Sequence, residues 1–481
     1  MASAAFTGKL WIDNGEHDAL SGETFETMNP STGKLLARLA RGRREDVDRA
    51  VRAAARAFPA WSRTDPNTRA RLLWKAGELL ERDLDQLARL ETLDTGKPLK
   101  NARTIDVPRS ADTFFYFSGW ATKFGGDTIP VRGPFLNYTQ REPLGVIGAI
   151  IPWNFPLLLA ARKIAPALAS GNTVVIKPPE EASLTTLALA RLLGEAGIPD
   201  GVVNVVTGFG EEAGEALVEH ESVAKIAFTG GTETGKRIMR TAASTLKKLS
   251  LELGGKSPNV VFADADIPAA VKAAVSGAFY NQGELCTAGS RLLVERGVYD
   301  RVLELVVGGA RALVPADPLL PETELGPLIS EAHRDKVAGY IERGEKEGAR
   351  REIGGRASGP GYFLEPAVFS AVGETMELSH EEIFGPVVAV LPFDDLEHAA
   401  RLADATPYGL AAGVWTRDIG KAHRFASRIR SGTVWINTYN RFDAASPYGG
   451  TKMSGFGREN GRAALEELTQ VKSVWVALDE T

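Results

Sequence analysis

Cys286 is the only cysteine among the 481 residues, so it cannot form a disulfide within the chain. Free cysteines are usually buried and pack as small apolar residues, which is the simplest alternative to a chemical role. Gly283 and Gly289 flank it in Asn281-Gln-Gly-Glu-Leu-Cys-Thr-Ala-Gly289. A thiolate nucleophile needs room and nearby backbone N–H groups, and glycine permits that close approach. The function of the chain therefore depends on whether Cys286 reacts.

Two glycine-rich segments could bind the phosphates of a nucleotide. Gly208-Phe-Gly-Glu-Glu-Ala213 matches the G-x-G-x-x-A dinucleotide pattern. Glu211 and Glu212 would, however, repel a pyrophosphate at the start of the following helix. Phe228-Thr-Gly-Gly-Thr-Glu-Thr-Gly-Lys236 also precedes a predicted helix and offers unhindered backbone N–H groups. Thr232 could instead cap that helix, which is compatible with an anion site because both use the same free donors.

The hydrophobic pattern predicts the elements that must position these residues. Apolar residues at helical spacing predict helices at 44–58 and from Pro66 to near Gly96. Short β-branched runs follow, with strands predicted at 145–151, 173–177, 202–206, 224–228 and 259–262. Helices are predicted between them at 156–169, 183–195, 211–219 and 232–241. This alternation predicts an α/β fold with a doubly wound parallel sheet.

A second α/β unit is predicted in the C-terminal half. Its helices are expected near 267–279, 298–312 and 331–346, and its strands near 291–295 and 386–391. The segment 471–476 alternates like a strand and has few local partners. It could pair with a sheet edge of another subunit, which would make the protein an oligomer, or pair within its own chain.

Composition excludes several classes of protein. The chain is 44% hydrophobic and 24% charged, which is typical of globular proteins, and its net charge is −5. No basic run indicates nucleic-acid binding. The uncharged stretch between Glu142 and Arg162 contains Pro143, Pro152 and Pro156, so it cannot be one membrane-spanning helix. The N-terminal residues lack the pattern of a signal peptide, and a single cysteine fits a reducing compartment, so we expect a cytoplasmic protein.

Seven motifs in order resemble those of the NAD(P)-dependent aldehyde dehydrogenase superfamily and extend over nearly the whole chain. They are Pro152-Trp-Asn-Phe-Pro156, Lys177-Pro-Pro-Glu180, Phe228-Thr-Gly-Gly-Thr-Glu-Thr-Gly235, Glu252-Leu-Gly-Gly-Lys256, Gly283-Glu-Leu-Cys286, Glu381-Glu-Ile-Phe-Gly-Pro386 and Ser454-Gly-Phe-Gly-Arg-Glu459. The resemblance implies NAD-dependent oxidation of an aldehyde to a carboxylic acid through a cysteine thiohemiacetal and a thioester. No metal site is expected.

The resemblance implies four catalytic residues. Cys286 is similar to the family's nucleophile. Asn154 and the backbone N–H of Cys286 are similar to the family's oxyanion hole, where an amide can donate a hydrogen bond without titrating. Glu252 is similar to the general base for the hydrolytic water, a role that requires a dry pocket to raise its pKa. Glu459 is similar to a second glutamate that relays protons. Glu252 could instead be a structural carboxylate, and Glu459 a salt-bridge partner.

The resemblance also implies the cofactor contacts. Lys177 and Glu180 match the contacts to the adenosine ribose, and Glu382 matches the contact to the nicotinamide ribose. Glu180 would repel a 2′-phosphate, so NAD is favoured, with NADP possible. Gly230 and Gly231 match the loop at the pyrophosphate, which argues against 208–213. The full set implied is Ile151, Trp153, Lys177, Glu180, Gly210, Phe228, Gly230, Gly231, Leu253, Glu382 and Phe384.

Positions that match the family's substrate tunnel are Phe155, Leu159, Arg162, Tyr280, Leu285, Thr287 and Phe442. Relatives that oxidise simple aliphatic aldehydes often have an aromatic residue where this chain has Arg162. A guanidinium there could bind a carboxylate or a phenolic oxygen, or it could turn outward and pair with an acid. Semialdehyde dehydrogenases of the succinate type often have a second arginine where this chain has Tyr280. We therefore expect an aromatic or hydrophobic aldehyde first, and a semialdehyde with a carboxylate second.

The resemblance implies a three-part organisation. The NAD-binding domain is expected at 1–122 and 144–253, the catalytic domain at 254–453, and an oligomerisation element at 123–143 and 469–481. The expected assembly is a homodimer or homotetramer, with an aldehyde as substrate and neither a nucleic-acid nor a membrane partner. CoA-acylating relatives typically lack the glutamate matched by Glu252, and no histidine forms a cysteine-hydrolase signature. A non-catalytic structural protein would not need Cys286, Asn154 and Glu252.

Overall fold

The predicted β-branched runs form the centre of an eight-stranded sheet in the computed structural model, which describes residues 8–478. The strand order is β2 (Gly15–His17), β1 (Leu10–Ile12), β9 (Val203–Val205), β8 (Thr173–Lys177), β7 (Val146–Ile150), β10 (Val223–Thr229), β11 (Lys248–Glu252) and β23 (Gly455–Phe456). Strands β7 to β11 are parallel. The order reverses between β7 and β10, and open α/β sheets bind ligands at such a switch point.

Alternate residues of β7 pack on opposite faces of this sheet. Ile147 and Ala149 contact the core built by α2 (Pro66–Arg82), α3 (Leu84–Thr95), α5 (Val107–Trp120), α6 (Pro156–Ala169) and α7 (Leu184–Ala196). Val146 and Ile150 contact the core built by α1 (Arg44–Trp61), α8 (Glu215–Glu219) and α9 (Thr232–Ala242). Because side chains alternate between faces along a strand, both faces are covered by helices. The predicted α/β class with a doubly wound parallel sheet is confirmed.

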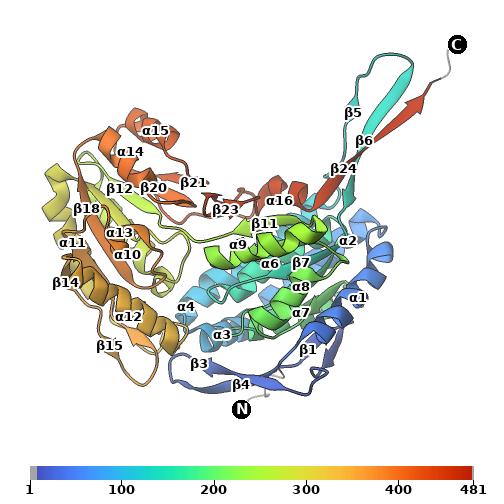
Figure 1. Cartoon of the computed structure of the whole chain (residues 1–481), viewed down its shortest axis with the longest axis horizontal. Helices are drawn as coiled ribbons and strands as arrows, with labels where there is room; N and C mark the ends of the chain where they lie inside the picture. The colour runs from blue at the N-terminus through green and yellow to red at the C-terminus, as the bar shows by residue number, and fades with distance from the viewer. Residues whose placement is uncertain (1–7, 479–481) are drawn as a thin grey trace.

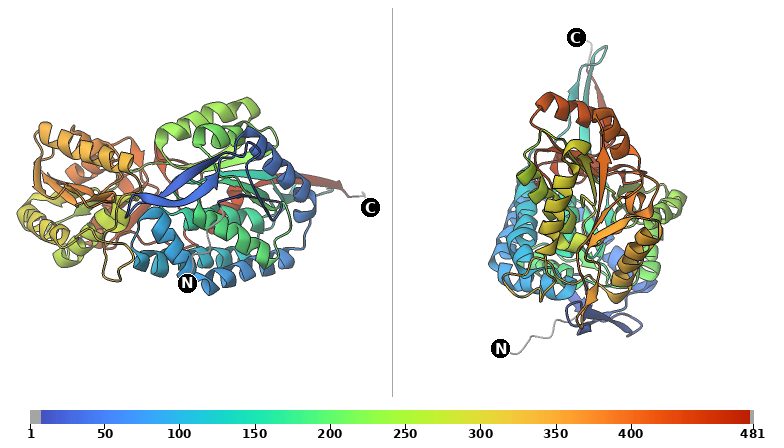
Figure 2. Two further views of the ribbon diagram at one scale, coloured as in Figure 1. Left: turned by 90° about the horizontal axis from the view of Figure 1, so that it is seen from below. Right: turned by 90° about the vertical axis from the view of Figure 1, so that its left-hand side faces the viewer.

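A second, seven-stranded sheet lies beside the first, as Figures 1 and 2 show. Its order is β14 (Arg350–Ile353), β17 (Ala367–Ser370), β18 (Val387–Phe393), β13 (Arg291–Glu295), β12 (Pro258–Val261), β20 (Ala411–Trp415) and β21 (Thr433–Ile436). One face packs against α10 (Ile267–Phe279) and α11 (Tyr299–Arg311). The other packs against α12 (Glu331–Lys346), α13 (Glu377–His380), α14 (Leu396–Asp404) and α15 (Ile419–Arg428).

A three-stranded antiparallel sheet projects from the body of the protein (Figure 1). It consists of β24 (Thr469–Ala477), β6 (Phe135–Pro143) and β5 (Thr128–Ile129), in that order. The predicted C-terminal strand therefore pairs within its own chain, with Thr469 opposite Pro143 and Ala477 opposite Phe135. Its other edge has no strand partner among residues 8–478. Two pieces of the predicted domains, 1–7 and 479–481, lie outside the described residues.

Short elements complete the described chain. Two-stranded pairs are β3 (Thr24–Asn29) with β4 (Lys34–Ala40), β15 (Ala357–Ser358) with β16 (Phe363–Leu364), and β19 (Tyr408–Gly409) with β22 (Thr451–Lys452). The short helix α4 (Leu99–Asn101) lies between α3 and α5 in the chain, and the short helix α16 (Gly461–Glu467) lies between β23 and β24. Across the described range, no helix is long and apolar enough to cross a membrane.

Three of the predicted elements are wrong in detail. The helix expected from Pro66 to Gly96 is two helices, because Asp83 leaves the helical conformation at φ −96° and ψ 17°. The helix expected at 211–219 begins with a π-helical turn at Gly210–Gly214 before α8. The strand expected at 259–262 belongs to the second sheet, because β11 occupies the position beside β10 in the first and β12 pairs with β13.

Candidate active site

A cavity of about 790 Å³ lies where the carboxyl ends of β7 and β10 face the second sheet. It is lined by segments that follow β7 and β10, by the end of β11, by α10 and by the loop before β13. Parallel strands place their carboxyl ends at one edge of the sheet, so residues distant in sequence converge there. All four predicted catalytic residues line this cavity: Asn154, Glu252, Cys286 and Glu459.

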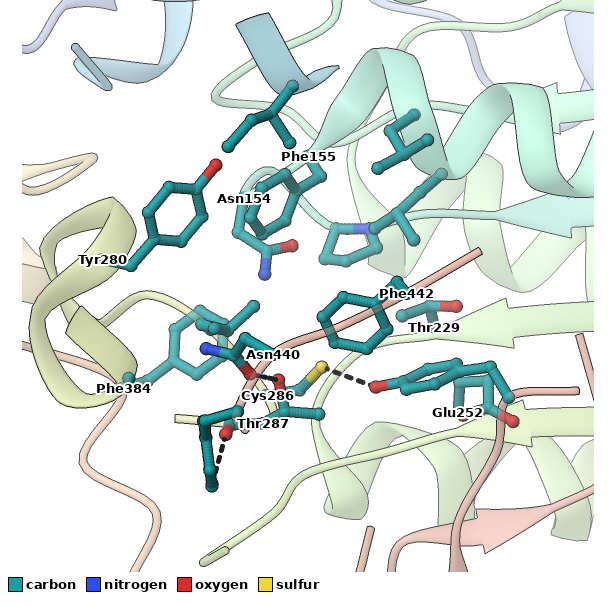
Figure 3. Close-up of a pocket in the computed structure, with 18 of the residues that line it drawn as sticks. Asn154, Phe155, Thr229, Glu252, Tyr280, Cys286, Thr287, Phe384, Asn440 and Phe442 are labelled. Atoms are coloured by element: carbon teal, nitrogen blue, oxygen red, sulfur yellow. Dashed lines mark hydrogen bonds between the residues drawn. The ribbon is translucent and has the colours of Figure 1, made fainter. Parts of the chain in front are cut away.

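Cys286 is half-buried on the loop between Gly283 and β13. Its Sγ lies 3.1 Å from Oη of Tyr448, which Figure 3 draws as a dashed line. Burial raises the pKa of the Cys286 thiol to about 12, and the hydrogen bond from Tyr448 opposes that rise. The sulfur is therefore a neutral thiol at rest, and it needs a proton acceptor before it can attack.

Asn154 follows β7 and is 4% exposed. Its Nδ2 donates to the carbonyl of Glu284 at 3.0 Å, which leaves the second N–H of the amide free. Figure 3 shows this amide extending into the cavity that also contains Cys286. The arrangement suits a neutral donor to an oxyanion formed at the sulfur.

Lys97 binds the backbone of Asn154. Its Nζ donates to the Asn154 carbonyl at 2.9 Å, and the ammonium lies 4.1 Å from the centroid of the Phe155 ring. Asp106 accepts a hydrogen bond from the same ammonium, and Glu91 is 3.6 Å away. All three charged side chains are buried, and burial raises the pKa of Glu91 to about 7. This buried cluster holds the backbone at Asn154 in one position.

Glu252 is the last residue of β11 and is 3% exposed. Neither of its carboxylate oxygens has a hydrogen-bond partner within the described chain. Burial, followed by the nearby charge of Glu459, raises the pKa of Glu252 well above its usual range, against the opposing charge of Lys163. An unpartnered carboxyl with a raised pKa is a suitable general base near neutral pH.

Glu459 forms a buried ion pair with Lys163, a partner that the sequence did not identify. Lys163 Nζ donates to its Oε1 at 2.6 Å, and Glu459 is 7% exposed. Its other oxygen, Oε2, has no partner within residues 8–478. The salt-bridge alternative for Glu459 is therefore present in the structure. It does not exclude proton relay, because Oε2 stays available and the charge of Glu459 acts on Glu252.

A second cavity of about 600 Å³ continues along the carboxyl edge of the first sheet and is lined by three predicted cofactor residues, Glu180, Gly210 and Phe228. Lys177 lies 3.0 Å from Glu180, and the Gly210 N–H donates to the same carboxylate. Part of the segment 208–213 thus lines this cavity, but the Gly210 N–H is already bonded to Glu180 and is not free for a phosphate. Glu212 in the same segment is paired with Arg41 at 2.7 Å. Ile151 lines neither cavity; its N–H donates to the Lys177 carbonyl at 3.3 Å.

The loop between β10 and α9 has free hydrogen-bond donors. Gly231, not Thr232, is the N-cap of α9, and no side chain caps the helix. The hydroxyls of Thr229 and Thr232 lack partners in the described structure. A Cβ on Gly231 would meet nothing within 4 Å, so its backbone is open to a ligand. Free N–H groups at a helix start bind anions, so this loop fits a pyrophosphate.

The cavity around Cys286 is also lined by six of the predicted cofactor residues: Trp153, Gly230, Gly231, Leu253, Glu382 and Phe384. Glu382 accepts a hydrogen bond from the Gly255 N–H at 2.8 Å, and burial raises its pKa to about 7. Phe384 adopts a positive φ of 58° and packs edge-on against Trp153, with ring centroids 5.3 Å apart. His333 Nε2 lies 2.7 Å from the Phe384 carbonyl and holds this conformation.

All seven predicted tunnel residues line the same cavity. Phe155 stacks on Tyr280, with centroids 6.4 Å apart and rings 16° from parallel. Phe442 packs edge-on against Tyr448 at 5.6 Å. Arg162 has no ion-pair partner among the described residues, so the alternative in which it turns outward to an acid is not observed.

Sequence reasoning missed several residues of this site. They are Lys97, Arg109, Lys163, Arg441 and Tyr448. Lys163 carried a signal, because it follows Arg162 in an otherwise uncharged helix. Tyr448 carried none, because it is separated from Cys286 by 162 positions. Within residues 8–478, no group of His, Cys, Asp and Glu could hold a metal ion.

The doubly wound sheet, the groove at its switch point and the enclosed cysteine are features of a dinucleotide-dependent oxidoreductase. A model of the aldehyde dehydrogenase family matches residues 17–474, and the chain belongs to this family. It is 48% identical to the mitochondrial aldehyde dehydrogenase of Rattus norvegicus, over 99% of this chain and 92% of that protein. It is an enzyme of the aldehyde dehydrogenase class.

Solved structures agree with this assignment. The NAD+ complex of an aldehyde dehydrogenase from Bacillus cereus has a TM-score of 0.97 and 47% identity, covering 98% of this chain and 97% of that one. The indole-3-acetaldehyde dehydrogenase AldA of P. syringae, in complex with NAD+ and IAA, has a TM-score of 0.98 and 42% identity. That match covers 99% of this chain and 98% of the other.

Proposed function

We propose that the enzyme oxidises an aldehyde to a carboxylic acid with NAD, through a thiohemiacetal and then a thioester on Cys286. The observation that carries the proposal is Glu252. Its carboxyl is buried and unpartnered in the same cavity as the only cysteine of the chain. A structural carboxylate would be satisfied by nearby donors, whereas a base that acts on water must keep its oxygens free.

The residues divide the reaction between them. Glu252 accepts the thiol proton, and the Cys286 sulfur adds to the aldehyde carbon to give a thiohemiacetal. The free N–H of Asn154 and the backbone N–H of Cys286 stabilise the oxyanion. The loop at Gly230 and Gly231, together with Glu382, would hold NAD, which when bound would supply the hydride acceptor needed to convert the thiohemiacetal to the thioester. After Glu252 has passed the thiol proton on through Glu459, it takes a proton from water as the water oxygen adds to the thioester. The C–S bond then breaks, the acid leaves, and Glu252 returns this proton to the Cys286 sulfur.

NAD fits the groove better than NADP. The carboxylate of Glu180 lies at the end predicted for the adenosine ribose, where it is held by Lys177 and Gly210. A 2′-phosphate would lie close to this negative charge, and like charges repel strongly at short range. Both solved relatives named above contain NAD+. NADP is the weaker alternative.

The favoured candidate for the substrate is an aromatic or hydrophobic aldehyde. Phe155, Tyr280 and Phe442 line the cavity and offer flat apolar surfaces. The P. syringae relative is named for an aldehyde with an aromatic ring. The unpaired Arg162 in the same cavity favours the second candidate, a semialdehyde that carries a carboxylate.

We infer that the eight-stranded unit binds the cofactor, the seven-stranded unit carries the nucleophile, and the projecting sheet forms subunit contacts in a homodimer or homotetramer. The projecting sheet supports the last role, because Phe135 and Trp475 are exposed and the outer edge of β24 has no strand partner in the described chain. The acidic net charge and the single cysteine support a cytoplasmic location.

The proposal is tested by mixing the protein with NAD and an aldehyde and following NADH absorbance. A panel of propanal, hexanal, benzaldehyde and indole-3-acetaldehyde covers small, aliphatic and aromatic substrates. NADH must form with at least one of them, and NADPH must form more slowly when NADP replaces NAD. The absence of NADH with every aldehyde would refute the proposed function.

A further inference from the structure

Three arginines surround the outer part of the cavity. Arg109 lies on α5, Arg162 on α6 and Arg441 in the loop after β21, and all three line the cavity wall. Arg109 and Arg162 are half-buried, whereas Arg441 is exposed. None forms an ion pair or side-chain hydrogen bond with the described part of the chain.

Aromatic rings hold two of the guanidinium groups. The guanidinium carbons of Arg109 and Arg162 lie 5.7 and 6.0 Å from the centroid of the same ring, Phe442. Arg162 also lies 5.7 Å from the Tyr448 ring. An arginine that stacks on an aromatic face keeps its N–H groups in the ring plane free for a ligand. The two cations are thus fixed in place while their donors remain unused.

The positive charge of this cluster is not neutralised within the cavity. Burial lowers the pKa of Arg109, and the charges of Arg162 and Arg441 lower it further, against Tyr280 and Asp106. Of the acids that line the cavity, Glu459 is paired with Lys163, and the pKa values of Glu252 and Glu382 are raised. Like charges gathered in a partly buried site are unfavourable unless an anion joins them.

The position of the cluster fixes where that anion would lie. Arg162 lies 5.7 Å from the ring of Tyr448, whose hydroxyl is 3.1 Å from the Cys286 sulfur, so this arginine lies near the reacting sulfur. Arg441 is exposed, so it lies at the cavity mouth. Phe155 and Tyr280 line the space between with flat apolar faces. An aldehyde at Cys286 would therefore place its far end, across an apolar spacer, at Arg109 and Arg441.

We propose that the substrate of this enzyme is an aldehyde that carries a carboxylate at its far end, bound there by Arg109 and Arg441 across an aromatic or similarly flat spacer. The assignment rests on the proposed oxidation at Cys286, and it combines the two substrate candidates above. A planar guanidinium binds a carboxylate through two parallel N–H···O bonds, so two such arginines recognise a terminal carboxylate strongly.

The test uses one pair of substrates that differ only in charge. 4-Formylbenzoate carries the carboxylate, and its methyl ester has nearly the same shape without the charge. For the native enzyme we expect kcat/KM to be at least about 10-fold higher for 4-formylbenzoate, because hydrogen bonds to a charged group strengthen binding by about that factor or more. A higher or equal kcat/KM for the ester would overturn the proposal.

The variants Arg109→Met and Arg441→Met should each lower kcat/KM for 4-formylbenzoate by about 10- to 100-fold, mainly through KM. The same variants should leave kcat/KM for the methyl ester nearly unchanged. Arg441→Lys should restore part of the lost kcat/KM, because a single ammonium keeps the charge but not the paired donors. Arg441 is exposed in a loop, so its variants remain informative if Arg109→Met fails to fold.

Arg52→Met is the matched control. Arg52 is exposed on α1 and pairs with Asp48 at 3.0 Å, so its loss changes the net charge equally but leaves the cavity intact. Its kcat/KM for both substrates should match the native enzyme. Equal losses on acid and ester in the Arg109 and Arg441 variants would show a structural role and refute the carboxylate site. No NADH from any aldehyde would instead refute oxidation at Cys286 itself.

Discussion

The substitution Glu252→Gln separates the two halves of the reaction. Glutamine has nearly the same shape as glutamate but cannot accept a proton, and no hydrogen bond of Glu252 to the described chain would be lost. Removal of a positioned general base lowers a rate by about 10²- to 10⁴-fold. We therefore expect steady-state NADH production to fall by that factor. An initial burst of NADH, up to one per active site, should remain but rise more slowly, because water must replace Glu252 as the acceptor of the Cys286 proton.

The burst is measured by stopped-flow NADH absorbance with benzaldehyde and saturating NAD. Glu221→Gln, at an exposed position far from the cavity, is the matched control and should show native kinetics. A steady-state rate in Glu252→Gln close to the native value would refute the assignment of Glu252 as the base. Loss of both burst and steady state would show that Glu252 is also the only acceptor for the Cys286 proton.

Because folding raises the pKa of Glu252, we expect Glu252→Gln to increase the stability of the protein although it lowers the activity. A carboxyl whose pKa is raised by folding binds more protons in the folded state, between its unfolded pKa of about 4.3 and its higher folded pKa. Stability therefore falls as pH rises through this window, by about 1.4 kcal/mol for each unit of elevation. Glutamine removes this penalty.

We expect Glu252→Gln to unfold at a higher temperature than the native enzyme at pH 8, and at nearly the same temperature at pH 4. Thermal unfolding followed by circular dichroism at both pH values measures the difference. The native steady-state rate should rise with pH through the Glu252 pKa, because only the carboxylate accepts a proton. A variant that is less stable at pH 8 would contradict the burial argument for Glu252.

Further predictions concern the other parts of the site. Cys286→Ala should bind NAD as the native enzyme does, by fluorescence titration, yet yield no NADH; turnover at the native rate would exclude the sulfur as nucleophile. Lys97→Met leaves two buried acids without their cation, so we expect a loss of about 3–5 kcal/mol in unfolding free energy and a lower kcat, through displaced Asn154. Unchanged kcat in a folded Lys97 variant would mean that the lysine does not position the amide. Glu180→Ser should raise KM for NAD and lower the NAD-to-NADP ratio of kcat/KM; an unchanged ratio would show that Glu180 does not select the cofactor.

Much of the fold was predictable because its signals are local. The strands at Thr173–Lys177 and Arg291–Glu295, and the helices at Pro156–Ala169, Ile267–Phe279 and Glu331–Lys346, have the predicted bounds. Periodicity and β-branched composition act over a few residues, so they are readable from sequence. The break at Asp83 and the transfer of β12 to the second sheet were missed, because packing against distant segments decides both.

The sequence by itself determined the type of chemistry. Cys286 precedes β13 of the second sheet, whereas the motifs around Asn154, Glu252 and Gly230 lie at strand ends of the first sheet, and a parallel sheet brings such ends together. Their convergence into one cavity therefore follows from a local pattern repeated along the chain. The predicted cap of α9 was wrong, because Gly231 is the N-cap residue where Thr232 was expected.

Only the tertiary structure decided the surroundings of these residues. Tyr448 reaches the Cys286 sulfur across 162 positions, and Lys163 reaches Glu459 across 296. Arg109, Arg162 and Arg441 come from two helices and a loop, and nothing in their spacing predicts that they line one wall. Charge and pKa depend on distance and burial, which the closure of the whole chain sets. The sequence therefore specified the reaction, and the packing of distant segments specified the surroundings that select its substrate.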